Sequence, residues 1–323
     1  MPAGCVIGVD LGGTKLLAGA VDRDLGVHHR ASRRSGSASF EELLEKLVAV
    51  VTEVREVTEG EVPAVGVGIP SLMDLERGVP GFTAHLPLVG VPLRDVLAER
   101  LGLPVFVAND ATLAMLVEHR LGAARGASDA VMLTLGTGIG GGLVVDGRLV
   151  HGAVGAAGEP GHMTIDMDGP PCVCGSAGCF ETLASGRALG LEGARVARAA
   201  SDSELARALG AGREITGALV TELAHDGDRA ARDVVALVGM RLGVGIASLV
   251  NLLNPSVVVV GGGMVAAGDL LLEPARSVVR ERALPPSRDV VSIVPARFGG
   301  ESGMLGAALF AMDGLAGPAA AAA

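Results

Sequence analysis

Several residue types are scarce or absent, and each absence argues against a class of partner. The chain has no Trp, no Tyr and six Phe among 323 residues. Proteins that bind single-stranded nucleic acid stack the bases on aromatic side chains, which this chain can hardly supply. Its net charge is −10, and it has no basic run that could displace counterions from a phosphate backbone. We therefore expect no nucleic-acid partner.

Long apolar runs and a leader are also missing. The first residues reach Asp10 without a positively charged stretch, so they predict neither a signal peptide nor a membrane span. No later segment offers 18 apolar residues without a polar break. We expect a cytoplasmic protein with no membrane partner, in which thiols stay reduced.

Glycine, in contrast, is abundant, with 49 residues, and hydrophobic residues make up 49% of the chain. The length favours two domains, and the glycines cluster after apolar runs, as in loops whose backbone lines a ligand. Alternating strands and helices predict an α/β fold with ligands at the carboxyl edge of a sheet. Strands are predicted at 6–9, 64–67, 105–108, 131–135, 143–145, 257–260 and 290–294, and helices at 41–59, 93–101, 205–209, 217–225 and 229–253, with two more starting near 110 and 269.

A weak internal repeat points to the architecture. Residues 131–149 resemble the opening segment shifted by 124 positions, so that Gly12 falls on Gly136. Both copies show a strand, a glycine turn, a second strand and an acidic turn, and Asp146-Gly147 is a strong hairpin signal. Two such hairpins facing each other across a cleft would hold a phosphate chain. Two unrelated glycine-rich turns remain the alternative.

The glycine loops do not fit the commonest nucleotide folds. Gly136, Gly138 and Gly141 match the dinucleotide fingerprint in spacing. That fingerprint needs a helix to receive the pyrophosphate, whereas a strand at 143–145 comes next here, which disfavours a Rossmann dehydrogenase. The lysine-containing P-loop motif does not occur in the sequence.

Two loops remain as candidate phosphate sites. Their glycines allow backbone N–H groups to approach phosphate oxygens, and their threonines add hydroxyl donors. Asp10 would repel a polyphosphate unless Mg²⁺ lay between them, although it could instead cap a turn. The candidate nucleotide-binding residues in these loops are Asp10, Gly12, Gly13, Thr14 and Lys15, then Gly136, Thr137 and Gly138.

An Asn-Asp pair stands between a predicted buried strand and a helix start. The Asp110 carboxylate could accept a proton from a bound hydroxyl as a general base. The Asn109 amide both donates and accepts, so it could fix neighbouring hydroxyls. Ordinary helix N-capping is the alternative, because both residue types are favoured at that position.

Three of the four cysteines, Cys172, Cys174 and Cys179, lie within eight residues, and His162 stands ten positions before the first. One histidine and three thiolates complete a tetrahedral Zn²⁺ shell and leave no open position, so the site should be structural. Disulfides are the alternative, which an odd cluster in a reducing compartment disfavours. Cys5 stands apart and should be inert.

These motifs together resemble a known superfamily. The Asp-x-Gly-Gly-Thr-Lys loop, the Gly-Thr-Gly loop and the late Gly-Gly-Gly turn are similar to those of actin, hexokinase and the heat-shock ATPases. Within that superfamily the chain resembles the ROK family from Val6 to about Phe310, including its Glu-x-Gly-His and Cys-x-Cys-Gly-x-x-Gly-Cys-x-Glu segments. The resemblance implies two actin-like (ribonuclease H-like) α/β domains flanking a nucleotide/sugar cleft. Residues 1–120 plus about 303–323 would form the first domain, and 121–302 the second.

The resemblance also implies a function. It suggests ATP- and Mg²⁺-dependent phosphorylation of a hexose, with glucose converted to glucose 6-phosphate and Asp110 as the base. Mannose, fructose, allose or N-acetylmannosamine as substrate, or polyphosphate as donor, stay open, and we expect a homodimer or homotetramer. In the family, the sugar hydroxyls would be bound by Asn109, Asp110, Glu159, His162 and Glu181, with Gly262 and Gly263 bordering the adenosine and Gly303 and Gly306 on the same side. His162 would serve zinc through one ring nitrogen and the sugar through the other.

Two rival functions and two departures from the family pattern qualify this hypothesis. Repressors of the same family carry a helix-turn-helix before the first loop, for which Asp10 leaves no room. A catalytically silent sugar-binding protein is disfavoured by the intact Asp110. Ser71 stands where the family usually has glycine, and His85 where asparagine is common, which weakens any claim that glucose is preferred.

Overall fold

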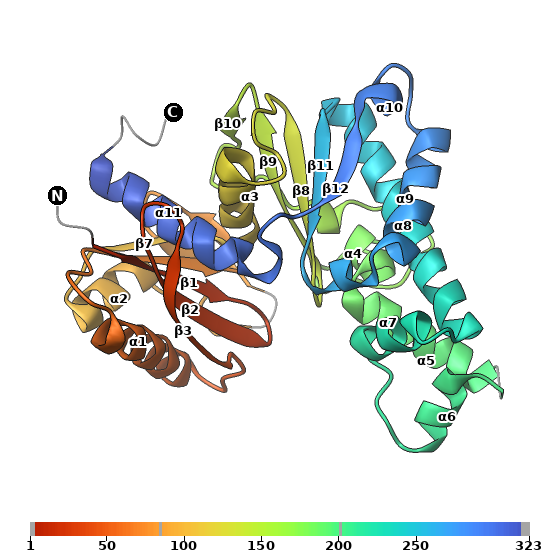
Figure 1. Ribbon diagram of the computed structural model, residues 1–323, viewed down its shortest axis with the longest axis horizontal. Coiled ribbons are helices and arrows are strands. Elements are labelled where there is room, and N and C mark those ends of the chain that lie inside the picture. Colours follow the sequence, from red (N-terminus) through yellow and green to blue (C-terminus); the bar gives the residue numbers. More distant parts are fainter. Residues whose placement is uncertain (1–3, 84–85, 200–201, 318–323) are drawn as a thin grey trace. The chain divides into compact units, whose positions relative to one another are not determined.

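The computed structural model describes residues 4–83, 86–199 and 202–317, and its two large sheets share one strand order (Figure 1). The first sheet is β3-β2-β1-β4-β7, made of β1 Val6–Leu11, β2 Lys15–Val21, β3 Val27–Arg34, β4 Val65–Ile69 and β7 Val105–Asn109. The second is β10-β9-β8-β11-β12, made of β8 Ala130–Leu135, β9 Ile139–Val145, β10 Arg148–Leu149, β11 Val257–Gly261 and β12 Ser292–Pro295.

The predicted repeat is therefore confirmed as a repeated sheet. The bounds of β8 and β9 are those of β1 and β2 shifted by 124 positions. In each sheet an antiparallel hairpin leads to two strands that run parallel to the first. Asp146 and Gly147 both have positive φ, at 49° and 72°, as a two-residue hairpin turn of type I′ requires.

The described chain divides into two compact units. One comprises the described residues within 1–126, 142–158 and 301–323, and the other those within 127–141, 159–199 and 202–300. Residues 142–158, which the sequence analysis placed in the second domain, group with the first unit. Their backbone packs directly on it, because a Cβ added at Gly142 would collide with Met115, and one at Gly155 with the carbonyl of Met73.

Helices cover both faces of the first sheet. They are α1 Phe40–Val57, α2 Leu93–Leu101, α3 Asp110–Leu121 and α11 Ser302–Ala316. Gly8 and Gly66 lack side chains where the α11 backbone crosses β1 and β4, since a Cβ at either would collide with a carbonyl oxygen of α11. The C-terminal helix thus returns to the first sheet, as the family resemblance implies, and its first turn lies at the carboxyl end of β1.

The second unit, which holds β8, β11, β12 and the start of β9, is largely helical. Its helices are α4 Phe180–Ala184, α5 Gly186–Ala199, α6 Glu204–Gly210, α7 Gly217–His225, α8 Arg229–Leu253, α9 Asp269–Arg282 and α10 Ser287–Val290. Among the described helices, α8 is long and apolar enough to cross a membrane by length and composition. In the fold, 61% of its most apolar window is buried, and it packs against α4, α5, α7 and α9. Helix α8 therefore has the burial of a core helix.

A short two-stranded hairpin also belongs to the first unit. The hairpin of β5 Leu72–Asp74 and β6 Val79–Phe82 comes directly after β4.

In the second unit, the predicted strand at 290–294 begins only at Ser292, because residues 287–290 form α10. That part of the sequence prediction was wrong.

Candidate functional site

The first unit gathers polar residues at the carboxyl edge of its sheet. Strands β1, β4 and β7 are parallel neighbours, with Asp10 paired to Gly68 and Ile69 to Asn109. Asp10 lies near the end of its strand, and Asn109 and Asp110 lead from the third strand into α3. The register therefore places both aspartates at one edge, with Gly68 between their strands.

Both carboxylates are half-buried, and both have raised pKa values. Burial raises the pKa of Asp110 to about 6. The backbone N–H of Ala111, which donates to Oδ1 over 2.8 Å, lowers this pKa and so offsets part of the effect of burial. Burial, and then the nearby charge of Asp110, raise the pKa of Asp10 to about 7, which Lys15 partly offsets. A general base works best when its pKa lies near the working pH, so Asp110 has a suitable environment for that role.

Asp10 also faces the first turn of α11. The ideal Cβ position of Gly303 lies 2.7 Å from its carboxyl carbon, so any larger residue at position 303 would displace the carboxylate. The positive end of the α11 dipole favours a negative charge at this place. Sequence reasoning placed Gly303 on the nucleotide side of the fold; the structure adds its direct contact with Asp10.

The helix-capping alternative holds for Asn109. Its Oδ1 accepts the backbone N–H of Thr112 over 2.9 Å, as an N-cap residue does. Its Nδ2 donates to the carbonyl of Ser71 over 3.3 Å. Capping fixes the Asn109 amide at the sheet edge, directly before Asp110.

The first glycine loop presents its tip to solvent. Gly12 N–H donates to the carbonyl of Lys15 over 2.8 Å, and the residues from 13 to 15 are exposed. No atom lies within 4 Å of an ideal Cβ at Gly13, nor at Gly136 and Gly263 in the second unit. The packing of the chain alone therefore does not require glycine at these positions, which suits a ligand that approaches the backbone.

The second unit brings the other predicted loops together. The N–H of Gly136 donates to the carbonyl of Gly138 over 3.0 Å, and Gly262, with φ 84°, packs its Cα against Leu135. Glu181 reaches the same loop, since its Oε2 accepts the N–H of Ile139 over 3.4 Å. The strand ends of β8 and β11 and the start of α4 thus share one region.

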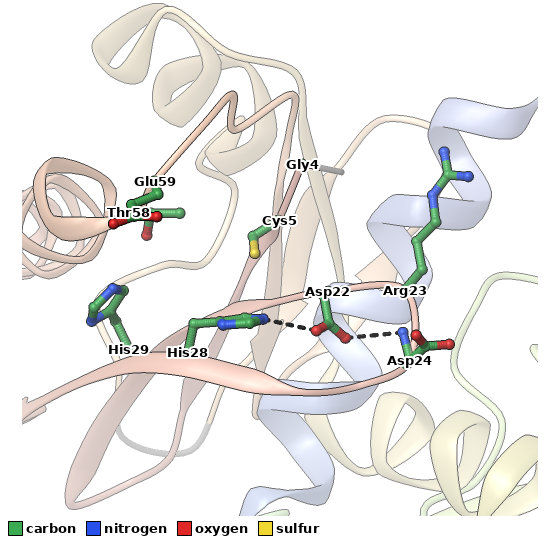
Figure 2. A pocket seen from close by; sticks show the side chains of 9 residues that line it. All are labelled: Gly4, Cys5, Asp22, Arg23, Asp24, His28, His29, Thr58 and Glu59. Atoms are coloured by element: carbon green, nitrogen blue, oxygen red, sulfur yellow. Dashed lines mark hydrogen bonds and ion pairs between the residues drawn. The ribbon is translucent and has the colours of Figure 1, made fainter. Parts of the chain in front are cut away.

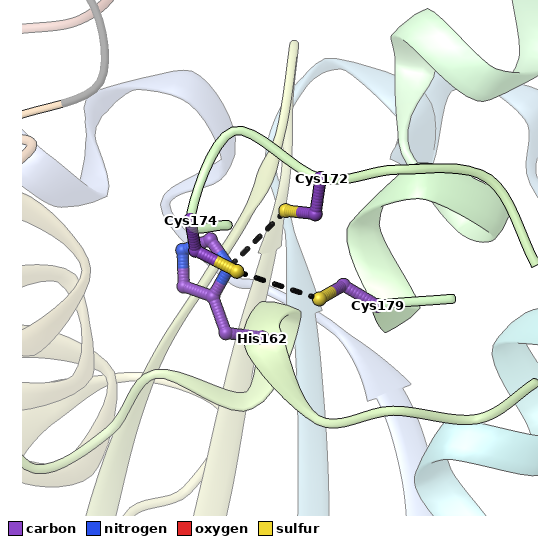
Figure 3. A group of neighbouring side chains, drawn as sticks. All are labelled: His162, Cys172, Cys174 and Cys179. Carbon is purple, nitrogen blue, oxygen red and sulfur yellow. Dashed lines mark hydrogen bonds between the residues drawn. The ribbon is translucent and has the colours of Figure 1, made fainter. Parts of the chain in front are cut away.

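The four predicted zinc ligands converge in the second unit (Figure 3). Their candidate ligand atoms all lie within 4.8 Å of one another. Nδ1 of His162 is 3.6 Å from Sγ of Cys172, and Sγ of Cys174 is 3.6 Å from Sγ of Cys179. A tetrahedral zinc shell needs ligand atoms about 3.5–3.8 Å apart for bonds of about 2.0–2.3 Å. The donor set and its spacing fit zinc.

The three thiols differ in acidity when no metal is present. Burial raises the pKa of Cys172 to about 12, and it also raises that of Cys179. The pKa of Cys174 is lowered, first by the backbone N–H of Ser176 and then by Cys172. Three thiolates so close together repel one another, and a bound cation is what would let all three ionise.

Of the predicted sugar-binding residues, His162 belongs to this cluster and Glu181 contacts it. Oε1 of Glu181 lies 3.8 Å from Nδ1 of His162 and 3.4 Å from Sγ of Cys172. Glu159 precedes the short turn Pro160–His162, and its carbonyl accepts the N–H of His162 over 3.2 Å. Because Nδ1 faces the thiols, Nε2 is the nitrogen that a second ligand could use.

Of the two residues that depart from the family pattern, Ser71 and His85, the structure describes Ser71. Ser71 is buried, and its hydroxyl lies 2.8 Å from the carbonyl of Leu72 and 2.9 Å from that of Phe82. The Ser71 hydroxyl therefore contacts backbone carbonyls of its own unit, at a position where the sequence showed only a departure from the glycine of the family. His85 lies outside the described residues.

A hollow of about 450 Å³ on the first unit contains none of the predicted site residues (Figure 2). It is lined by Gly4, Cys5, Asp22, Arg23, Asp24, His28, His29, Thr58 and Glu59. The Asp22 carboxylate accepts N–H groups of Asp24 and Gly26 and pairs with His28 over 2.7 Å. The Asp22 carboxylate thus already has hydrogen-bond partners within the protein.

Comparison with known proteins gives a consistent result. Residues 6–313 match the ROK family. The glucokinase of Streptomyces coelicolor is 34% identical over 96% of this chain and 98% of its own length. The xylose repressor of Caldicellulosiruptor bescii is 31% identical, over 87% of this chain and 71% of the repressor. The crystal structure of a ROK family glucokinase from Streptomyces griseus, in complex with glucose and AMPPNP, superimposes with a TM-score of 0.88, 36% identity and coverage of 96% and 99%.

Proposed function

This chain belongs to the ROK family, and we propose that it is an ATP-dependent sugar kinase that phosphorylates glucose at its 6-hydroxyl. The main support for this proposal is the position of Asp110, whose pKa is raised, at the sheet edge. The fold around it matches that of a glucokinase over 96% of the chain. The similar glucokinase structure holds glucose and an ATP analogue.

In this proposal Asp110 is the general base. Its carboxylate takes the proton from the 6-hydroxyl as that oxygen bonds to the γ-phosphorus, while the bond from the γ-phosphorus to the bridging oxygen breaks and ADP leaves. The N–H of Ala111 donates to Oδ1 and so fixes the orientation of the carboxylate. Phosphoryl transfer needs mainly positioning and charge stabilisation, so one base with fixed geometry suffices.

The remaining site residues take roles from the same family pattern. We assign Asn109, Glu159, His162 and Glu181 to the sugar hydroxyls. Asp10 would hold Mg²⁺, the hard cation that lets a carboxylate lie beside a polyphosphate. The nucleotide is assigned to Gly12, Gly13, Thr14 and Lys15 of the first unit, and to Gly136, Thr137, Gly138, Gly262 and Gly263 of the second.

Zinc would be held by His162, Cys172, Cys174 and Cys179, whose spacing fits a closed tetrahedral shell. With no open position, bound zinc supplies cross-linking and no Lewis-acid chemistry. The ring of His162, whose Nδ1 lies 3.6 Å from Sγ of Cys172, would then be held in place, so that Nε2 could meet a sugar hydroxyl. We also propose a cytoplasmic homodimer or homotetramer; light scattering should then give two or four times the 32.3 kDa of one chain.

A substrate panel tests the kinase proposal. ADP release from ATP should be measured with glucose, mannose, fructose, allose and N-acetylmannosamine, and glucose should also be assayed with polyphosphate as donor. Glucose with ATP should give the highest kcat/KM, and Asp110→Ala should abolish it. Binding of sugar without any phosphoryl transfer would instead favour the regulator function that the repressor relative represents.

A further inference from the structure

Ser71 links three segments of the first unit. It is 3% exposed and stands between β4 and the β5–β6 hairpin. Its N–H donates to the carbonyl of Ile69 over 2.9 Å, and its hydroxyl lies within hydrogen-bond distance of the carbonyls of Leu72 and Phe82, which are partners in the β5–β6 pair. Its own carbonyl accepts Nδ2 of Asn109.

The Asn109 amide is thereby held at both ends. Its oxygen is occupied by the N–H of Thr112, and its nitrogen by the carbonyl of Ser71. These two partners fix which end of the amide is which, because a carbonyl cannot donate and an N–H cannot accept. One N–H of Nδ2 and one lone pair of Oδ1 remain to meet a ligand in a defined direction.

We propose that Ser71 is a positioning residue for Asn109, and through it for the bound sugar. This inference rests on the kinase function proposed above. Without the Ser71 hydroxyl, the carbonyls of Leu72 and Phe82, at 2.8 and 2.9 Å, both lose the side-chain donor that they share. Leu72 stays paired with Phe82 in the hairpin, but the turn at Ser71 loses its own side-chain contact with β6, and the carbonyl that orients Asn109 is held less firmly.

The composition of the chain offers a direct test. It contains three asparagines, Asn109, Asn251 and Asn254, and no glutamine. Protein labelled with ¹⁵N in asparagine side chains therefore gives three NH₂ pairs in an NMR spectrum. Asn109→Ala assigns the pair of interest by its disappearance.

In the wild-type protein, one Asn109 proton should lie downfield and exchange slowly with water. In Ser71→Ala it should move upfield and exchange at least about tenfold faster, while Ser71→Thr, which keeps the hydroxyl, restores it. Thr58→Val is the matched control, since it removes a hydroxyl that donates to the carbonyl of Val54 in the same unit. Asn109 signals that are identical in Ser71→Ala and wild type would overturn the inference.

Kinetics distinguish positioning from general support of the fold. Ser71→Ala should raise KM for glucose about tenfold and leave KM for ATP unchanged. In an Asn109→Ala background the same change should have no further effect on KM, because the residue through which it acts is gone. Additive effects would overturn the inference. Ser71→Gly serves as the second variant if the alanine protein is unstable.

The two hypotheses can fail separately. A wild-type protein that phosphorylates none of the sugars overturns the kinase proposal, and the NMR comparison then still decides whether Ser71 orients Asn109. A wild-type protein that is active, with unchanged kinetics and NMR signals in Ser71→Ala, overturns the positioning role alone.

Discussion

Two neighbouring carboxylates, Asp10 and Asp110, are costly to ionise in the folded protein. Each has a pKa above the ordinary value of a carboxyl, so the folded state binds more protons than the unfolded state between about pH 4 and pH 7. Their effect on the free energy of unfolding is thus absent below about pH 4, becomes more destabilising as the pH rises from 4 towards 7, and is complete above pH 7. The pair is tolerated at the cost of stability, as is common at functional sites.

Asp110→Asn should separate activity from stability. We expect turnover to fall by about 10²–10⁴-fold, because the general base is lost. At pH 8, Tm should rise by a few degrees, and the gain should disappear near pH 4. Asp22→Asn is the control: a hydrogen bond from His28 lowers the pKa of Asp22, so its neutralisation should bring no gain in Tm. An inactive variant with a lower Tm at pH 8 would contradict the electrostatic part of this argument.

The same pKa values predict the pH dependence of the wild-type enzyme. kcat/KM for glucose should fall on the acid side with a midpoint between about pH 6 and 7, as the aspartate pair takes up a proton. Initial rates at constant ionic strength from pH 5 to pH 9 would show this limb. A midpoint near 4 would mean that neither carboxylate is shifted in the free enzyme.

At the scale of elements, the segment from His162 to Phe180 has little regular structure to hold it. Its strand pairing is limited to two isolated bridges, Thr164 with Cys179 and Pro171 with Ala177. Cross-linking by a metal would compensate for this, because binding energy at a structural site contributes to folding.

Cys174→Ser should therefore lose zinc and lower both Tm and activity. Purified wild-type protein should contain about one zinc per chain by elemental analysis. Cys5→Ala, which changes a cysteine in the first unit, should keep the zinc content of the wild type. Metal-free wild-type protein, purified without chelators, would exclude the zinc assignment.

The elements also differ in how far they could be predicted. Helices α2, α7 and α8 have the predicted bounds, because their apolar periodicity and their ends agree. Strand β3 gave no such signal: it lies at a sheet edge, and its sequence Val-His-His-Arg-Ala-Ser-Arg-Arg is mostly polar. Helix α10 is a single turn, Ser-Arg-Asp-Val, and its last residue, Val290, is the first of the apolar run that predicted a strand.

Strand ends make one part of the site predictable. Asn109 and Asp110 could be placed at the sheet edge because a strand-to-helix junction lies there in any parallel α/β sheet. The bond from Asn109 to Ser71 depends on the register of β4 against β7, and the contact of Gly303 with Asp10 on the packing of α11. Neither register nor packing can be read from local sequence.

For the whole molecule, sugar binding should appear as a gain in stability. A ligand at about 100 times its Kd adds about 2.7 kcal/mol to the free energy of unfolding, so glucose should raise Tm in a concentration-dependent way. Glu181→Gln should weaken this shift, and Thr58→Val should not. A wild-type Tm that does not respond to glucose, mannose or fructose would count against a hexose ligand.

The absence of Trp and Tyr has a spectroscopic consequence at one position of the fold. Phe82 ends β6 with its side chain 38% exposed, and its carbonyl accepts the Ser71 hydroxyl. Phe82→Trp would place the sole indole of the chain on the hairpin that Ser71 secures. With no other indole or phenol emitting, its fluorescence colour and anisotropy would come from that hairpin alone. Every titration with sugar or nucleotide could then be followed optically at a single, known location.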